Sequence, residues 1–206
     1  MRSNILVTGG AGYLGSTLAR VLLDGGHQVR ALDSLLHGGQ ALLGLYFHDD
    51  FTFLHGDIRS PGVIERALEG VEAVVHLAAI VGDPACARHP ETARETNLDG
   101  ALALYQESRR RGIGRFVFAS TCSNYGKMAD PSAYVSEESE LGPISLYAET
   151  KVAVERHLLD FPSSDGPAVT VMRFATLFGL SARMRFDLTV NTLAMELLTK
   201  RRFVVY

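Results

Sequence analysis

A tyrosine and a lysine four residues apart, Tyr147 and Lys151, are the first residues in this sequence whose types and spacing suit chemistry. On a helix, side chains at positions i and i+4 share a face, so the Lys151 ammonium would lie beside the Tyr147 phenol. A phenol with its ordinary pKa of about 10 is a poor base at neutral pH, and a neighbouring positive charge favours its ionised form. The pair therefore suits removal of a proton from an alcohol, although the same spacing also arises on solvated helices without such a role.

A second group of candidates is a glycine-rich loop between the first predicted strand and the helix that follows it. The loop fits G-x-G-x-x-G through Gly10, Gly12 and Gly15, and it fits G-x-x-G-x-x-G equally well when Gly9 replaces Gly10. Glycines here allow a tight turn and a close approach of a pyrophosphate, whose charge is favoured by the helix N-terminus. Asp33 ends the second predicted strand, where a carboxylate can accept hydrogen bonds from the ribose of a dinucleotide.

Short β-rich apolar runs alternate with helical patterns, which indicates βαβ units around a parallel sheet. Strands are predicted at 4–8, 27–32, 51–55, 72–78, 115–120 and 168–174. Helices are predicted at 13–26, 60–70 and 91–111, each ending at or just before a glycine. A polar loop from Lys127 to Pro143 is expected to lie over the site, and the final stretch, 200–206, looks like the middle of a strand.

Composition narrows the class of protein. With 206 residues and 47% of them hydrophobic, the chain can bury one sizeable core, and its net charge of −3 argues against a nucleic-acid partner. Two cysteines outside any C-x-x-C pair, and the lack of a long apolar run, indicate a soluble cytoplasmic protein with no membrane contact. The seven histidines show no metal-ligand spacing, so we expect no metal site.

The order of these motifs resembles the extended short-chain dehydrogenase/reductases, in particular the NAD-dependent sugar-nucleotide epimerase/dehydratase family, from Ile5 to about Asn191. The resemblance implies an α/β fold: a doubly wound, Rossmann-like parallel sheet with helices on both faces, and a C-terminal substrate lobe that is mostly absent from this chain. We expect an NAD-binding Rossmann domain over residues 1–175 and the start of an incomplete substrate-binding lobe over 176–206. Because family members usually continue further, the chain is expected to be either part of a longer protein or a truncated member.

The resemblance also assigns roles to individual residues. The family's glycine loop takes the second of the two forms, and further cofactor contacts match "GDIR", "HLAA" and an asparagine of the long helix. The expected NAD-binding residues are Gly9, Gly12, Tyr13, Leu14, Gly15, Asp33, Asp57, Ile58, Leu77, Ala78, Ala79, Asn97, Ser120, Tyr147 and Lys151. The expected catalytic residues are Thr121, Tyr147 and Lys151. Substrate contacts are expected from Thr121, Tyr147 and Thr176, the last of which stands where the family has an asparagine.

The two residues after Thr121 indicate the reaction. The family's 4,6-dehydratases have an Asp-Glu pair there and its decarboxylases a glutamate at the second place, whereas this chain has Cys122 and Ser123. A thiol and an alcohol are weak substitutes for carboxyl groups tuned as acid and base. We therefore expect a nucleotide-sugar 4-epimerase that works through a 4-keto intermediate.

Three alternatives to the epimerase stay open: a nucleotide-sugar dehydratase, a ketoreductase, and a dinucleotide-binding module that has lost catalysis. In each case the expected cofactor is NAD. The expected partners are a nucleotide-diphosphate sugar and a second copy of the chain in a homodimer.

Overall fold

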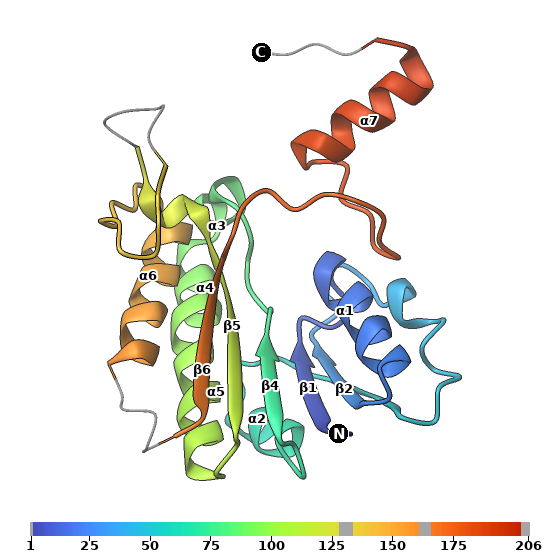
Figure 1. Cartoon of the computed structure of the whole chain (residues 1–206), viewed down its shortest axis with the longest axis vertical. Helices are drawn as coiled ribbons and strands as arrows, with labels where there is room; N and C mark the ends of the chain where they lie inside the picture. Colours follow the sequence, from blue (N-terminus) through green and yellow to red (C-terminus); the bar gives the residue numbers. More distant parts are fainter. Residues whose placement is uncertain (1, 128–133, 161–165, 203–206) are drawn as a thin grey trace.

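A six-stranded parallel sheet in the order β3-β2-β1-β4-β5-β6 forms the centre of the computed structural model, which describes residues 2–127, 134–160 and 166–202 (Figure 1). The strands are β1 (Asn4–Thr8), β2 (Gln28–Asp33), β3 (Phe51–His55), β4 (Ala73–His76), β5 (Arg115–Thr121) and β6 (Ala168–Phe174). Because β1 pairs with both β2 and β4, the chain reverses its winding direction there, and ligands of such sheets bind beyond the strand ends at that point. The expected doubly wound Rossmann-like fold is confirmed.

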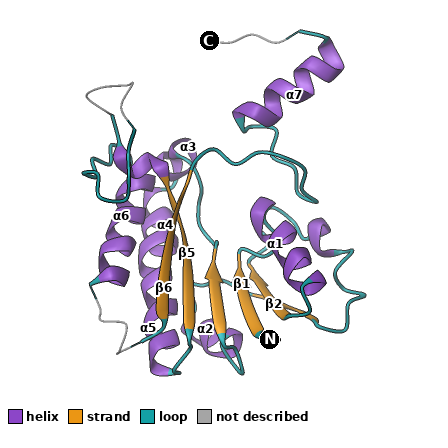
Figure 2. Ribbon diagram, in the orientation of Figure 1, coloured by secondary structure: helices purple, strands orange, loops and turns teal. Residues whose placement is uncertain are grey.

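Helices connect the strands on both faces of the sheet (Figure 2). They are α1 (Tyr13–Asp24), α2 (Pro61–Ala67), α3 (Asp83–Arg88), α4 (Pro90–Arg94), α5 (Gly100–Arg110), α6 (Leu146–Leu159) and α7 (Thr189–Lys200). Short turns add η1 (Gln40–Leu42), a π-helical turn η2 (Glu95–Asp99) and η3 (Cys122–Tyr125). The predicted long helix is thus present as α4, η2 and α5 in succession, whereas α3 and α7 were not predicted.

The two faces of the sheet have separate apolar cores because successive strand residues point to opposite sides. Leu6 of β1 packs with Phe116 and Phe118 of β5 in a core that α5 and α6 cover. Its neighbours Ile5 and Val7 pack instead in a second core against α1. The strands are thereby fixed in register, and their C-terminal ends hold the candidate residues of the site.

The polar loop after β5 does not lie where we expected it. None of its described residues lines the main cavity, and 128–133 fall outside the described residues. The loop instead contacts the edge of the sheet, where Arg173 of β6 donates to the Glu137 carbonyl (3.3 Å) and Tyr125 to the Ser136 carbonyl (3.0 Å). The predicted strand at the end of the chain is not tested, since Lys200 ends α7 and residues 203–206 are not described.

Candidate active site

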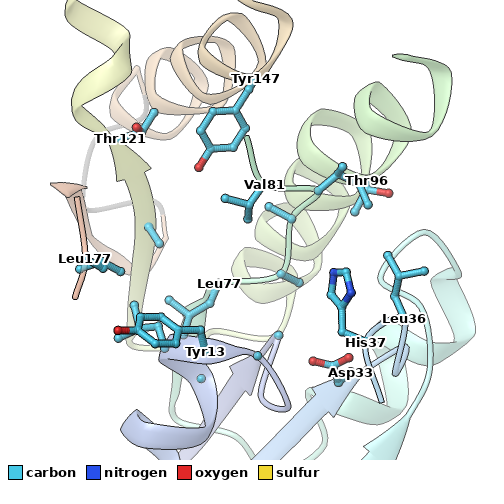
Figure 3. Close-up of a pocket in the computed structure, with 18 of the residues that line it drawn as sticks. Tyr13, Asp33, Leu36, His37, Leu77, Val81, Thr96, Thr121, Tyr147 and Leu177 are labelled. Carbon is cyan, nitrogen blue, oxygen red and sulfur yellow. The ribbon is translucent and has the colours of Figure 1, made fainter. Parts of the chain in front are cut away.

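A cavity of about 860 Å³ lies at the C-terminal ends of the strands. Figure 3 shows Tyr147 and Thr121 at one end of it and Asp33 and His37 at the other, with Tyr13 and Leu77 along its floor. It brings together all but one of the residues predicted from the sequence: Gly9, Gly12, Tyr13, Leu14, Gly15, Asp33, Asp57, Ile58, Leu77, Ala78, Ala79, Ser120, Thr121, Tyr147, Lys151 and Thr176. The exception is Asn97.

The glycine loop has room only for glycine at its two ends. Gly9 has a left-handed φ of +71°, and a Cβ there would lie 2.8 Å from the backbone nitrogen of Ala78. A Cβ on Gly15 would lie 2.1 Å from the Gly9 carbonyl oxygen, which no relaxation of a side chain could relieve. The residues at the start of α1 line the cavity, and the first backbone N–H groups of a helix have no partner within the helix itself.

Asp33 ties the glycine loop to the loop that follows β2. Its Oδ2 accepts from the backbone nitrogen of Ala11 (3.0 Å) and its Oδ1 from that of Leu35 (2.8 Å). Leu35 has a φ of +58°, an uncommon conformation for a leucine that this bond supports. Each carboxylate oxygen keeps a further lone pair for a ribose hydroxyl.

Asp57, one of the expected NAD-binding residues, already accepts hydrogen bonds within the protein. Arg59 donates to both of its carboxylate oxygens (2.7–3.1 Å), and this hydrogen bonding lowers the pKa of Asp57. The other end of the guanidinium donates to Glu95 of η2 (2.9 Å). Asp57 is thereby held as an anion at the rim of the cavity.

Asn97 lies behind the cavity wall and not in it. Its side chain is buried, with Oδ1 accepting from the backbone nitrogen of Ile80 (2.7 Å) and Nδ2 donating to the Ile80 carbonyl (2.9 Å). The arrangement does not favour the direct cofactor contact expected from the sequence. Asn97 instead fixes the segment after β4, which forms one wall of the cavity.

Tyr147 enters the cavity from the first turn of α6, as Figure 3 shows. The helix begins there because the Ser145 side chain accepts from the backbone nitrogen of Ala148 (3.3 Å). Thr121 ends β5, and its Oγ1 accepts from the backbone nitrogen of Ser123 (3.1 Å), which leaves its O–H free to donate. Strand and helix thus present a phenol and a hydroxyl to the same space.

Lys151 lies beside Tyr147, with its ammonium nitrogen 5.9 Å from the centre of the phenol ring. Its buried ammonium donates to the Ala119 carbonyl (2.8 Å) and lies 4.6 Å from the centre of the Phe118 ring, and burial lowers its pKa to about 8. Burial also raises the pKa of Tyr147 to about 12, opposed chiefly by the positive charge of Arg185. The phenol is therefore protonated in the protein without a bound cofactor, and the expected lowering of its pKa by Lys151 together with the nicotinamide ring stays a prediction about the cofactor complex.

His76 is buried beneath the cavity wall. Thr8 Oγ1 accepts from the backbone nitrogens of Leu77 and Ala78 (both 3.2 Å), so its own proton goes to His76 Nδ1 (2.7 Å). The imidazole stacks on Phe118 at 5.8 Å, and its Nε2 has no hydrogen-bond partner among the described residues. Burial, with a contribution from the positive charge of Lys151, lowers its pKa from 6.5 to about 3.

We expect the buried His76 to make the protein sensitive to acid. Between pH 6.5 and about 3 the unfolded chain binds a proton that the folded chain excludes, so the free energy of unfolding falls with falling pH. The slope from this group is about 1.4 kcal/mol per pH unit. Urea unfolding at pH 7, 6 and 5 should show a shallower decline for His76→Leu than for the wild type. Equal slopes in the two proteins would contradict the assignment.

Several cavity residues were not predicted from the sequence. His37 follows β2, and Arg183, Arg185 and Asp187 come from the segment between β6 and α7. Arg185 pairs with Asp187 (Nε to Oδ1 3.0 Å), while the Arg183 guanidinium has no hydrogen bond or ion pair within the described part of the chain. His37, Arg183 and Arg185 come together in the cavity through a contact between segments far apart in the sequence. No local sequence pattern indicates such a contact.

The fold and this site define an extended short-chain dehydrogenase/reductase: a Rossmann sheet with a glycine loop at α1 and a Tyr-x-x-x-Lys pair on α6. Residues 5–202 match the NAD-dependent epimerase/dehydratase family, and the chain belongs to that family. No helix within residues 2–127, 134–160 and 166–202 is long and apolar enough to cross a membrane.

The relatives have more than one activity. The UDP-glucose 4-epimerase of Corynebacterium glutamicum is 31% identical over 91% of this chain and 55% of its own length. The dTDP-glucose 4,6-dehydratase of Streptomyces niveus is 33% identical over 85% of this chain and 54% of its own length. The structure of the Thermus thermophilus UDP-glucose 4-epimerase in complex with NAD matches with a TM-score of 0.81 and 30% identity, over 95% of this chain and 61% of that one. The chain thus spans about half the length of the curated relatives it matches.

Proposed function

We propose that this chain carries the cofactor-binding and catalytic part of an NAD-dependent nucleotide-sugar 4-epimerase. The observation that carries the proposal is the pair Cys122 and Ser123, which line the cavity directly after Thr121. Expulsion of a C6 hydroxyl by a dehydratase requires a tuned acid and base, and neither residue is a carboxylic acid. Epimerisation requires only the hydroxyl-handling groups and the cofactor.

The carboxylates that do line the cavity are poor substitutes for the dehydratase pair. Asp33 and Asp57 lie toward the end of the cavity away from Tyr147 and are bound to backbone or to arginine. Asp187 comes from the C-terminal segment, but the Arg185 guanidinium beside it lowers its pKa, which opposes a role as general acid.

NAD fits the cofactor end of the cavity on three observations. The bare glycine loop admits a pyrophosphate, the first turn of α1 offers unpaired N–H groups, and the Asp33 carboxylate faces the same space. When bound, NAD accepts a hydride from C4 and returns it to the opposite face of the keto sugar.

The chain's own residues would handle the proton. Tyr147 would take the proton of the C4 hydroxyl and give it back to the epimeric alkoxide, while Thr121 would donate a hydrogen bond to the same oxygen. Lys151 and the positive nicotinamide ring would favour the phenolate, against the desolvation that keeps Tyr147 protonated in the free protein. Thr176, which also lines the cavity, is the proposed further substrate contact.

The test is incubation of the protein and NAD with UDP-, TDP-, GDP- and CDP-sugars in deuterated water. Direct return of the hydride gives a C4 epimer without solvent deuterium at carbon, because the transferred hydrogen passes between the sugar and the cofactor without exchange with water. A 4-keto-6-deoxy product that carries deuterium would instead establish a dehydratase. Thermal stabilisation by NAD with no product from any sugar would favour a cofactor-binding part that needs further chain for catalysis.

We expect NAD to bind more tightly than NADP. The Asp33 carboxylate would face a 2′-phosphate with like charge. Arg30, on the same strand and the obvious candidate to offset this charge, donates to the carbonyls of Arg66, Ala67 and Glu69 at the end of α2. Fluorescence titration with both cofactors at one ionic strength measures the ratio of the NADP to the NAD dissociation constant. Asp33→Ser should lower this ratio about tenfold. Equal or tighter NADP binding by the wild type would contradict the expectation.

A further inference from the structure

The chain between β6 and α7 crosses back to the start of α1, as Figure 1 shows in orange and red. We call residues 179–185 the bridging segment. The Tyr13 hydroxyl donates to the Gly179 carbonyl (2.7 Å), and Ser181 Oγ donates to the Tyr13 carbonyl (2.7 Å). The first residue of α1 therefore holds the bridging segment through both its side chain and its backbone.

Asn191 of α7 holds the same segment from the other side. Its Oδ1 accepts from the Gly179 backbone nitrogen (3.0 Å), and its Nδ2 donates to the Arg185 carbonyl (3.0 Å) and to the Tyr13 hydroxyl (3.2 Å). Asn191 is 6% exposed, so these bonds are largely shielded from water. The bridging segment is thus fixed at both ends before any ligand binds.

The bridging segment brings positive charge to the cavity. Arg185 is neutralised by its pair with Asp187, but Arg183 lines the cavity without a hydrogen bond or ion pair from its guanidinium among the described residues. The Arg183 backbone nitrogen donates to Ser181 Oγ (3.2 Å). Arg183 is thereby joined to the contacts that hold the bridging segment, which we call the clamp and which are formed by Tyr13, Ser181 and Asn191. Burial and then the charge of Arg183 lower the pKa of His37, so the adjacent imidazole remains a neutral donor.

We propose that Arg183 binds the diphosphate group of the ligand, together with the first turn of α1. A guanidinium without a protein partner, on the wall of a cavity that also contains an N-terminal helix turn, matches a group with two negative charges and several acceptor oxygens. The clamp formed by Tyr13, Ser181 and Asn191 positions the guanidinium. The proposal rests on the proposed function only in assuming a ligand with a diphosphate, which either the dinucleotide or the nucleotide sugar supplies.

Binding measurements separate the diphosphate from the rest of the ligand. Titration calorimetry of the wild type, Arg183→Gln and Arg183→Lys would use adenosine, ADP, NAD and UDP. Arg183→Gln should lower the affinity for at least one of ADP, NAD and UDP by about ten- to a hundredfold, because a charge-assisted hydrogen bond to the diphosphate is lost. The affinity for adenosine should not change. Arg183→Lys should recover part of the loss. Weaker binding of ADP and NAD would show that Arg183 binds the diphosphate of the dinucleotide. Weaker binding of UDP would show that it binds the diphosphate of the nucleotide sugar.

The control is Arg110→Gln, an exposed arginine at the far end of α5 that should change none of these affinities. Unchanged affinity of Arg183→Gln for ADP, NAD and UDP would overturn the proposal, as would an equal loss for adenosine or a wild type that binds no diphosphate. Because turnover is not measured, diphosphate binding that depends on Arg183 in a protein that converts no sugar would contradict the proposed function alone.

Discussion

Replacement of Tyr147 by phenylalanine is expected to lower turnover by about a thousandfold, since a positioned general acid–base typically contributes factors of this order. The affinity for NAD should hardly change, because the ring and its packing in α6 remain while only the hydroxyl in the cavity is lost. Steady-state kinetics with whichever nucleotide sugar proves to be a substrate in the deuterated-water test, together with an NAD titration, measure both effects. The loss should appear in kcat and in kcat/KM alike, as for a group that acts in the transition state.

The matched control is Tyr46→Phe, since Tyr46 is an exposed tyrosine that packs on Phe51 and Phe53 away from the cavity. Lys151→Met is expected to lower turnover to a similar extent and also to weaken NAD, because we assign the ammonium to both cofactor and phenol. Near-normal turnover of Tyr147→Phe would show that the Tyr-Lys spacing has no chemical role here.

Replacement of Glu155 by glutamine is expected to give the largest loss of stability, about 3 kcal/mol. Glu155 is 1% exposed and accepts from Arg173 of β6 (2.7–3.2 Å) and from Asn124 (2.8 Å). Removing its charge leaves the Arg173 guanidinium, which is largely buried, without its counter-ion. Urea unfolding at pH 7 measures the change in the free energy of unfolding.

A second glutamate tests whether burial is the cause. Glu196 pairs with Lys200 four residues later on α7, and both side chains are partly exposed. Glu196→Gln should therefore change the free energy of unfolding by less than about 0.5 kcal/mol. Similar losses in the two variants would refute the buried-pair explanation.

The strands and the cofactor loop could be predicted from the sequence because their signals are local. β-rich runs bounded by glycine and proline marked all six strands, and the short spacing of Gly9, Gly12 and Gly15 marked the glycine loop. The C-terminal side of the cavity could not be predicted in this way. The segment that carries Arg183 is held at the site by bonds such as that from Tyr13 to Gly179, which joins residues 166 positions apart and which no sequence periodicity indicates.

Two further features of the site depend on solvation and on competing contacts that the sequence does not show. The spacing of Tyr147 and Lys151 indicated a shared face but not that desolvation would raise the phenol pKa. Similarly, the match of Asn97 to a cofactor contact did not show that both ends of its amide are taken by Ile80.

The π-helical turn η2 joins two parts of the long helix, and the number of residues between them sets how these parts are rotated relative to each other. Thr92 before it and Thr96 within it line the cavity, and after it Leu104 and Tyr105 are buried in the core under the sheet. A π-turn holds one residue more than an α-turn, so the loss of one residue within η2 would be absorbed by a return to α-helical winding, whereas the loss of one residue early in α5 would rotate the rest of that helix by about 100°. The cavity wall and the core could then no longer be satisfied by the same helix. A deletion of one residue should accordingly be tolerated better within η2 than within α5.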